Sequence, residues 1–249
     1  MSGGLEVRGL RRRFGGVAAV EDVDLDVPAG AVTALIGPNG AGKTTLFHCI
    51  TGLDTADTGT VTLPGSTGSS GSRAPGGSGC AAALTDPDSS RLPLSGLPPH
   101  ARARAGVAWT FQRIELFAGL TVAENIRVGA ENRRSRPLLS GLLGLPDPRR
   151  AAVRATVTGV LGRLALSRAL LAPWQLLLVD ELSHGLSPLL ATRLYDVLAT
   201  LAATHPDRAV VLAEPHPREA LALADRVHVL RRGELAATGS PTDFDPATL

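Results

Sequence analysis

A nine-residue run in the first fifth of the chain constrains its fold more than any other feature. In order, it reads Gly37-Pro38-Asn39-Gly40-Ala41-Gly42-Lys43-Thr44-Thr45. The run matches G-x-x-x-x-G-K-[ST], in which small residues let backbone N–H groups converge on anionic oxygens. In this pattern Lys43 reaches the β- and γ-phosphates of a nucleotide, and the hydroxyl of Thr44 ligates Mg²⁺. The run therefore predicts a site for a magnesium nucleotide.

The flanks of this loop favour the same interpretation. Residues 31–36 are a β-rich apolar run, and residues 46–50 continue as a helix after the loop. The N-terminus of that helix adds partial positive charge where the phosphates would lie. The alternative is a glycine-rich turn that binds nothing, and the order of strand, loop and helix argues against it.

Composition limits the class of protein. A chain of 249 residues can bury the core of one domain, or of one domain with a subdomain. The net charge of +2 argues against a dedicated nucleic-acid binder, and two cysteines do not make a disulfide framework. No apolar stretch is long enough to cross a bilayer, and the N-terminus lacks a signal-peptide pattern. We therefore expect a cytoplasmic chain whose membrane role, if any, comes through a partner.

Apolar strands alternate with helices along most of the chain, which favours an α/β fold with a largely parallel sheet. The expected strands are residues 5–10, 23–27, 31–36, 61–63, 106–110, 176–181, 209–213 and 227–230. The expected helices are residues 46–50, 149–171, 189–203 and 217–225.

One segment is expected to lie outside the folded core. From Pro64 to Gly79, thirteen of sixteen residues are Gly, Ser or Pro. Such a stretch buries too little apolar surface to offset the entropy of ordering it. We predict a disordered surface insertion over residues 64–97.

A second acidic element lies in the C-terminal half. The apolar residues 176–179 run into Asp180 and Glu181, which is typical of a buried parallel strand with carboxylates at its end. In enzymes with this phosphate loop, such an aspartate holds Mg²⁺. The next residue, Glu181, would lie beside the γ-phosphate and orient or deprotonate an attacking water.

Together these motifs resemble the ATP-binding subunits of ABC transporters, and more narrowly the branched-chain amino acid uptake group. The resemblance covers nearly the whole chain as a single domain, residues 1–249, apart from the low-complexity insertion. It implies a P-loop NTPase with a mainly parallel core sheet, an N-terminal antiparallel β part and a helical subdomain. The segments that carry it are Gly37–Thr45, Thr110-Phe111-Gln112, residues 116–125, residues 180–188, residues 224–227 and Gly239-Ser240-Pro241.

The resemblance also implies roles for single residues. Phe14 matches the aromatic that stacks on adenine, whereas a core phenylalanine is the alternative. Gln112 matches the glutamine that contacts Mg²⁺ and the attacking water. The metal ligands would then be Thr44, Gln112 and Asp180, with ATP and Mg²⁺ as cofactors. Residues 113–120 match the region that meets the membrane subunit, and residues 183–188 match a loop at the dimer interface.

The sequence departs from the family pattern in its helical subdomain. Family members carry a motif similar to Leu-Ser-Gly-Gly-Gln that clamps the γ-phosphate bound to the opposite subunit. The corresponding positions here are 156–160, and only Gly159 agrees. An internal deletion that shortens the helical subdomain, residues 113–171, is the simplest explanation. A fused helix would hydrogen-bond its own N–H groups and offer none to a phosphate.

A second departure follows Glu214. The family places a histidine that contacts the γ-phosphate directly after this glutamate, but here Pro215 follows and His216 comes one position late. A shift of one residue at a strand end turns the side chain to the other face. His216 is either this catalytic histidine or an exposed loop histidine. Trp109, where the family has a basic residue, is expected to be a core or interface aromatic.

Two functions follow from these observations. The first is the ATPase subunit of an importer for solutes of branched-chain amino acid type, peripheral on the inner face of the cell membrane. Its partners would be membrane permease subunits and a second ATP-binding subunit. The alternative is a nucleotide-binding cassette that is hydrolysis-deficient or degenerate and acts only beside an intact partner. A soluble cassette for DNA repair or translation is a distant third, disfavoured by the charge and by residues 116–125.

Overall fold

An antiparallel sheet forms the N-terminal part of the protein. The computed structural model describes residues 3–64, 91–110, 174–181 and 188–249. The strands of this sheet are β1 (Gly3–Phe14), β2 (Val17–Pro28), β4 (Thr58–Pro64) and β5 (Arg91–Pro93). They pair in the order β2-β1-β4-β5. In β2 buried and exposed residues alternate from Asp22 to Val27, as expected for a sheet with one face on the core.

A second sheet forms the centre of the molecule. Its strands are β3 (Val32–Ile36), β6 (Val107–Thr110), β7 (Leu176–Asp180), β8 (Ala209–Glu214), β9 (Arg226–Arg231) and β10 (Glu234–Gly239). The order is β10-β9-β3-β8-β7-β6, and the pairings are parallel except between β10 and β9. Strands β3, β7 and β8 are buried along their whole length, because helices or a second sheet cover both faces. The predicted α/β class is confirmed.

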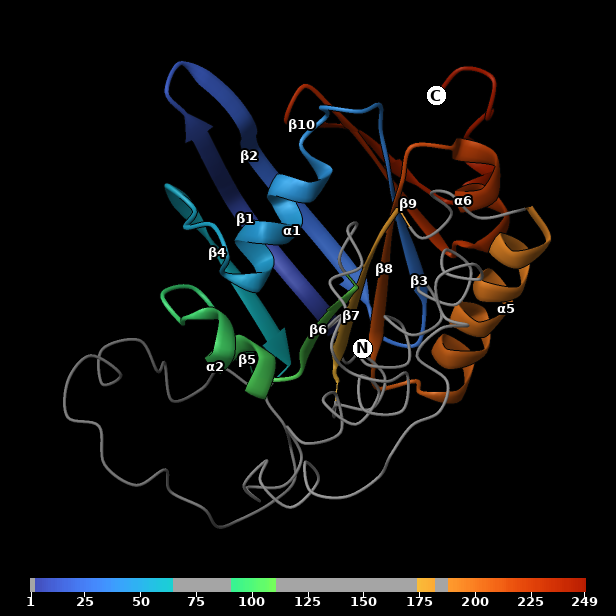
Figure 1. Ribbon diagram of the computed structural model, residues 1–249, viewed down its shortest axis with the longest axis horizontal. Helices are drawn as coiled ribbons and strands as arrows, with labels where there is room; N and C mark the ends of the chain where they lie inside the picture. Colours follow the sequence, from blue (N-terminus) through green and yellow to red (C-terminus); the bar gives the residue numbers. More distant parts are fainter. Residues whose placement is uncertain (1–2, 65–90, 111–173, 182–187) are drawn as a thin grey trace, which may run out of the picture.

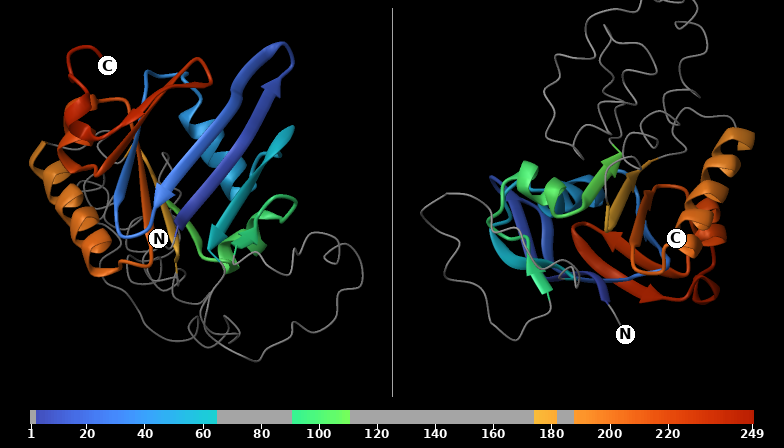
Figure 2. Two further views of the ribbon diagram at one scale, coloured as in Figure 1. Left: turned by 180° about the vertical axis from the view of Figure 1, so that it is seen from behind. Right: turned by 90° about the horizontal axis from the view of Figure 1, so that it is seen from below.

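The C-terminal helices cover one face of the central sheet, and the first sheet covers the other together with the helix that follows the phosphate loop (Figure 1). The helices are α1 (Lys43–Thr51), α2 (Pro99–Arg104), α5 (Pro188–Thr204), α6 (Pro217–Leu223) and the short η2 (Pro241–Asp243). Leu176 and Leu178 pack in the cluster that contains α1 and the antiparallel sheet, whereas Leu177 and Val179 pack against α5. The rear view in Figure 2 shows α5 and α6 on the side away from the antiparallel strands.

The low-complexity prediction was wrong at its C-terminal end. Arg91–Pro93 form β5 and pair with β4, although the sequence predicted disorder up to residue 97. Leu94 is fully buried, and the Arg91 side chain pairs with Glu6 at 3.0 Å. An apolar anchor and a charged pair therefore order this end, which a count of Gly, Ser and Pro does not detect. Residues 65–90 and the predicted subdomain 113–171 lie outside the described residues.

A buried arginine caps the C-terminal end of α1. The guanidinium of Arg102 donates to the carbonyls of Cys49 and Ile50 at 2.6 and 2.9 Å, and to that of Leu97 at 2.8 Å. The first two carbonyls belong to the last turn of α1, which lacks intrahelical donors and carries the negative end of the helix dipole. Arg102 thus ties α2 to the helix that follows the phosphate loop. Within the described ranges no helix has the length and apolar character needed to cross a bilayer.

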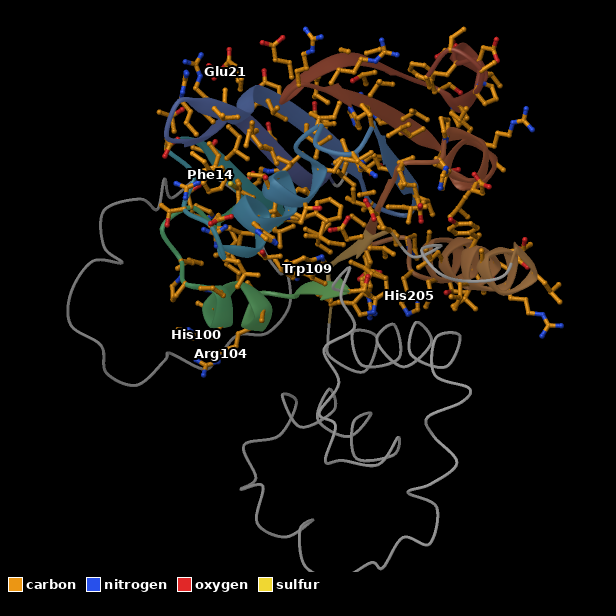
Figure 3. All side chains as sticks on the ribbon, turned by 45° about the horizontal axis from the view of Figure 1, so that its top comes forward. Phe14, Glu21, His100, Arg104, Trp109 and His205 are labelled. Atoms are coloured by element: carbon orange, nitrogen blue, oxygen red, sulfur yellow. The ribbon has the colours of Figure 1, made fainter. Side chains whose placement is uncertain are left out.

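We expect Arg102→Leu to lower the free energy of unfolding by roughly 3 to 5 kcal/mol, because it leaves three carbonyls without their donor. Equilibrium unfolding in urea measures this change. Arg104→Leu is the matched control, since Arg104 lies in the same helix and is exposed (Figure 3). Equal effects of the two substitutions would contradict the capping role.

Candidate functional site

Three parallel strands bring the predicted site residues to one edge of the central sheet. Ile36 of β3 pairs with Glu214 of β8, and Asp180 of β7 pairs with Ala213. Because parallel strands end at the same edge, the phosphate loop, the Asp180–Glu181 pair and the exit from β8 lie side by side. Ligands of α/β proteins bind beyond the carboxyl ends of the strands in this way.

The backbone of the phosphate loop passes so close to neighbouring strands that two of its positions require glycine. Gly42, the N-cap of α1, has a φ of 106°, and a Cβ there would collide with the carbonyl oxygen of Ala19 on β2. A Cβ on Gly37 would collide with the carbonyl oxygen of Leu230 on β9. The loop is therefore seated between the two sheets. The tip of the loop, residues 38–40, is exposed. Helix α1 begins directly after the loop, so its N-terminal N–H groups are available to an anion.

Lys43 is held under this loop. Its ammonium donates to the carbonyl oxygens of Gly37 at 2.6 Å and Pro38 at 3.2 Å, and the residue is only 4% exposed. Burial lowers the pKa of Lys43, while the negative charges of Glu181 and Asp180 act in the opposite direction. It is also the only lysine in the sequence. A phosphate entering the loop offers this buried ammonium stronger acceptors than the two carbonyls.

The predicted magnesium ligands Thr44 and Asp180 lie in contact. The Thr44 hydroxyl donates to Oδ2 of Asp180 at 3.0 Å. The other oxygen, Oδ1, is buried and has no hydrogen-bond partner among the described residues. Burial, more than any other cause, raises the pKa of Asp180 to about 6. An unpaired carboxylate oxygen beside a hydroxyl is a donor set that suits Mg²⁺, so these residues fit the metal.

Glu181 leaves the end of β7 in an unusual backbone conformation. Its φ is 47°, which is in the left-handed region that non-glycine residues seldom adopt. Its backbone N–H donates to the carbonyl of Ala213 at 2.9 Å, so the neighbouring strand stabilises this geometry. Strain of this kind concentrates at functional sites. Glu181 is half-buried and follows Asp180 at the sheet edge, where its charge acts on Lys43 of the phosphate loop.

Comparison with known proteins decides the family. The ABC transporter family model matches residues 20–184. The chain is 31% identical to the high-affinity branched-chain amino acid transport ATP-binding protein LivG of Salmonella typhimurium, over 96% of this chain and 92% of that protein. The chain belongs to the ABC transporter family. It is therefore an ABC-type ATPase cassette. Some of its relatives are import proteins for a different class of solute. It is 33% identical to the sulfate/thiosulfate import ATP-binding protein CysA of Mycolicibacterium paratuberculosis, over 98% of this chain and 62% of that protein.

Solved structures agree with the fold of this ABC cassette. A nucleotide-free ATP-binding cassette from an ABC transporter superimposes with a TM-score of 0.72 at 23% identity, covering 96% of this chain and 91% of that one. At this level of identity the likeness supports the fold alone. It agrees with the arrangement of a parallel core beside an antiparallel sheet.

The aromatic candidate Phe14 is exposed in the cassette. It ends β1 and is 46% exposed, so the alternative of a core phenylalanine is wrong. Trp109 on β6, by contrast, packs against the main core and meets His48 of α1 edge-on at 5.2 Å between ring centroids. Trp109 is partly buried, which agrees with the expectation of a core or interface aromatic. Figure 3 labels Phe14 at the N-terminal hairpin and Trp109 at β6, with α1 between them.

His216 lies beyond the end of β8, not on it. Glu214 is the last residue of β8 and is fully buried, where its Oε1 accepts a hydrogen bond from the Tyr195 hydroxyl at 3.0 Å. His216 is the N-cap of α6 and is exposed. The exposure agrees with the loop-histidine alternative, and a catalytic role for His216 stays a prediction.

Several predicted residues fall outside the described part of the cassette. These are Gln112, residues 113–120, the signature positions 156–160 and residues 183–187. Strand β6 ends at Thr110, opposite Val179 of β7, the strand that carries Asp180.

Sequence motifs did not reveal the contacts that seat the loop. Gly233, in the turn between β9 and β10, donates its backbone N–H to the carbonyl of Ala41 at 2.9 Å. Neither Ala19 nor Leu230, whose carbonyls face the loop glycines, belongs to a motif. These contacts use backbone groups, which residues of any type carry, so no sequence signal could have identified them.

We expect Asp180→Asn to stabilise the nucleotide-free protein at pH 7.5. Because the folded-state pKa lies above the unfolded value of 3.8, the ionised carboxylate lowers stability as pH rises through about 6. Asparagine removes that charge and keeps an acceptor for Thr44. The gain is on the order of 2 kcal/mol, or several degrees in melting temperature.

Thermal unfolding at several pH values measures this effect. The difference between variant and wild type should shrink below pH 6 and vanish below pH 4. The control is Asp196→Asn on α5, where the carboxylate is exposed. A variant that melts lower than wild type at pH 7.5 would contradict the role of burial. The same variant should lose the extra stabilisation that Mg²⁺ adds to ATP binding.

Proposed function

We propose that this chain is the ATP-binding subunit of an importer for solutes of branched-chain amino acid type. The observation that carries the proposal is the contact of Thr44 with Asp180, made beside the buried ammonium of Lys43 and next to Glu181. A phosphate loop, a strand-end carboxylate with a free lone pair and an adjacent glutamate are the components of an ATP-hydrolysing site. The family membership and the identity to LivG add support.

The proposed chemistry assigns one task to each group. The loop N–H groups and Lys43 would hold the triphosphate, and Thr44, Gln112 and Asp180 would hold Mg²⁺. When bound, the metal would supply positive charge that offsets the negative charge of the triphosphate. Glu181 accepts a proton from water while the water oxygen bonds to the γ-phosphorus. The bond from that phosphorus to the bridging oxygen breaks, which leaves ADP and inorganic phosphate.

We assign the partners on the same grounds. Membrane permease subunits would contact residues 113–120, and a second ATP-binding subunit would contact residues 183–188, because these segments match the family's interface regions. The chain would then be peripheral on the inner face of the cell membrane. Reconstitution with candidate permease subunits tests the solute. Leucine should stimulate turnover and sulfate should not, whereas the reverse result would favour the solute class of CysA.

The departure at residues 156–160 favours a second candidate, a cassette that binds ATP but does not hydrolyse it alone. Each site in such dimers is completed by the opposite subunit, so a partner with an intact motif could complete the site of this chain. A heterodimer would retain one working site, and a homodimer would have none. The prediction for the homodimer would be wrong if the purified chain alone hydrolysed ATP and the Glu181→Gln variant did not.

Titration with Mg²⁺-ATP tests both candidates. A ligand that binds only the folded state raises the melting temperature, and 100 times its Kd adds about 2.7 kcal/mol. An unchanged melting temperature at millimolar Mg²⁺-ATP would overturn nucleotide binding altogether. A rise without turnover, with turnover restored by a partner subunit, would support the heterodimer.

A further inference from the structure

An arginine covers one face of the Phe14 ring. The guanidinium carbon of Arg12 lies 4.6 Å from the ring centroid, a cation–π distance. The two residues are two positions apart on β1, so they share one face of the strand. An aromatic ring has two faces, and Phe14 remains 46% exposed with Arg12 in place. Val17, its cross-strand partner, is 68% exposed, so an apolar surface is open at this end of the hairpin.

Two aspartates hold Arg12 over the ring. Its Nη1 donates to Asp57 Oδ1 at 3.3 Å, and its Nη2 lies 3.7 Å from Asp54 Oδ1. The second oxygen of Asp57 accepts the backbone N–H of Arg13 at 2.7 Å, and its own N–H donates to the carbonyl of Arg11 at 2.8 Å. Only 22% of the Arg12 side chain is exposed. Arg12 is therefore clamped on both sides of its guanidinium and is not a mobile surface cation.

The clamp is connected to the helix of the phosphate loop. Asp54 lies in the turn after α1, beyond the C-cap Gly52, and its Oδ2 lies 3.1 Å from Nδ1 of His48 in that helix. The backbone N–H of Asp54 also donates to the carbonyl of His48 at 3.2 Å. One end of α1 thus carries the phosphate loop, and the other end fixes Arg12 and, through it, Phe14. The phosphate loop and the pair of Arg12 and Phe14 are therefore joined through α1.

We propose that Arg12 is a positioning residue for the base of the bound nucleotide. It holds the Phe14 ring at a fixed orientation and distance from the phosphate loop, and it leaves the opposite ring face to stack on a purine. A cation on one face draws π density toward itself, so the open face becomes less negative and stacks better on an electron-rich base. The inference rests on the proposed function, since it requires that the chain bind ATP.

Calorimetric titration of the full-length chain with two ligands tests this role. Mg²⁺-ATP carries a base, and Mg²⁺-tripolyphosphate does not. Arg12→Gln should raise the Kd for ATP about 5- to 10-fold and leave the Kd for tripolyphosphate within about twofold, since stacking contributes at the base alone. Asp57→Asn should give a smaller change in the same direction. The effect of Arg12→Gln should disappear in a Phe14→Ala background.

Arg11→Gln is the matched control. Arg11 lies on the same strand and pairs with Glu21 and Asp22 at the surface, away from the ring. Equal loss of affinity for both ligands in Arg12→Gln would show a merely structural role, and tighter ATP binding would show that Arg12 blocks the ring. Either result overturns the inference. Failure of the wild-type chain to bind either ligand would instead overturn the proposed function.

Discussion

Replacing Lys43 with alanine is expected to weaken binding of Mg²⁺-ATP by roughly 100-fold, as loss of charge-assisted hydrogen bonds in a buried site predicts. Lys43 is 4% exposed, and its ammonium donates to two carbonyls of the phosphate loop, so it is already in position for the phosphates. Alanine removes both the donor and the positive charge that offsets Asp180 and Glu181. Isothermal titration with Mg²⁺-ATP measures the effect.

The sequence offers a second assay for the same residue. Because Lys43 is the only lysine, an amine-reactive reagent can label just this side chain and the N-terminal amine. Mass spectrometry of the peptide that contains Lys43 should show slower acylation when Mg²⁺-ATP is present. Undiminished binding by Lys43→Ala, or labelling that ATP does not slow, would contradict the role of the loop.

Glu181→Gln is expected to lower turnover by about 10²- to 10⁴-fold and to change the Kd for Mg²⁺-ATP little, because loss of a general base affects the reaction step. Glutamine has the same size and can still orient water, but it cannot accept a proton. The backbone at this position, with a φ of 47°, is held by the bond to Ala213, so the substitution keeps the local geometry.

Turnover should be measured with the partner subunit that completes the site. A low rate in the variant then reflects the substitution and not an incomplete site. Glu219→Gln is the control, because Glu219 is an exposed acid on α6. Wild-type turnover in Glu181→Gln would show that another group accepts the proton. A proportional loss of binding and turnover would show that Glu181 supports the loop and does not act on water.

Local sequence patterns predicted most of the described elements, because the hydrophobic pattern that favours each element lies within the element itself. The apolar run before the phosphate loop became β3, and the run that ends in Asp180 became β7. Two strands were missed, β5 and β10. Strand β5 is three residues long and is ordered by pairing with β4, and β10 is an edge strand of mostly exposed residues. Neither has the periodicity that buried strands show.

The sequence alone determined the chemistry of the candidate site, because Lys43, Thr44, Asp180 and Glu181 have side chains and spacings that suit a magnesium triphosphate. Only the tertiary structure decided how those groups meet and what fixes them. Thr44 and Asp180 are 136 positions apart and touch because β3 and β7 are parallel strands of one sheet. Arg12 is clamped through Asp54 and Asp57 because α1 returns the chain to the first hairpin. Contacts between distant segments depend on packing, which has no local pattern in the sequence.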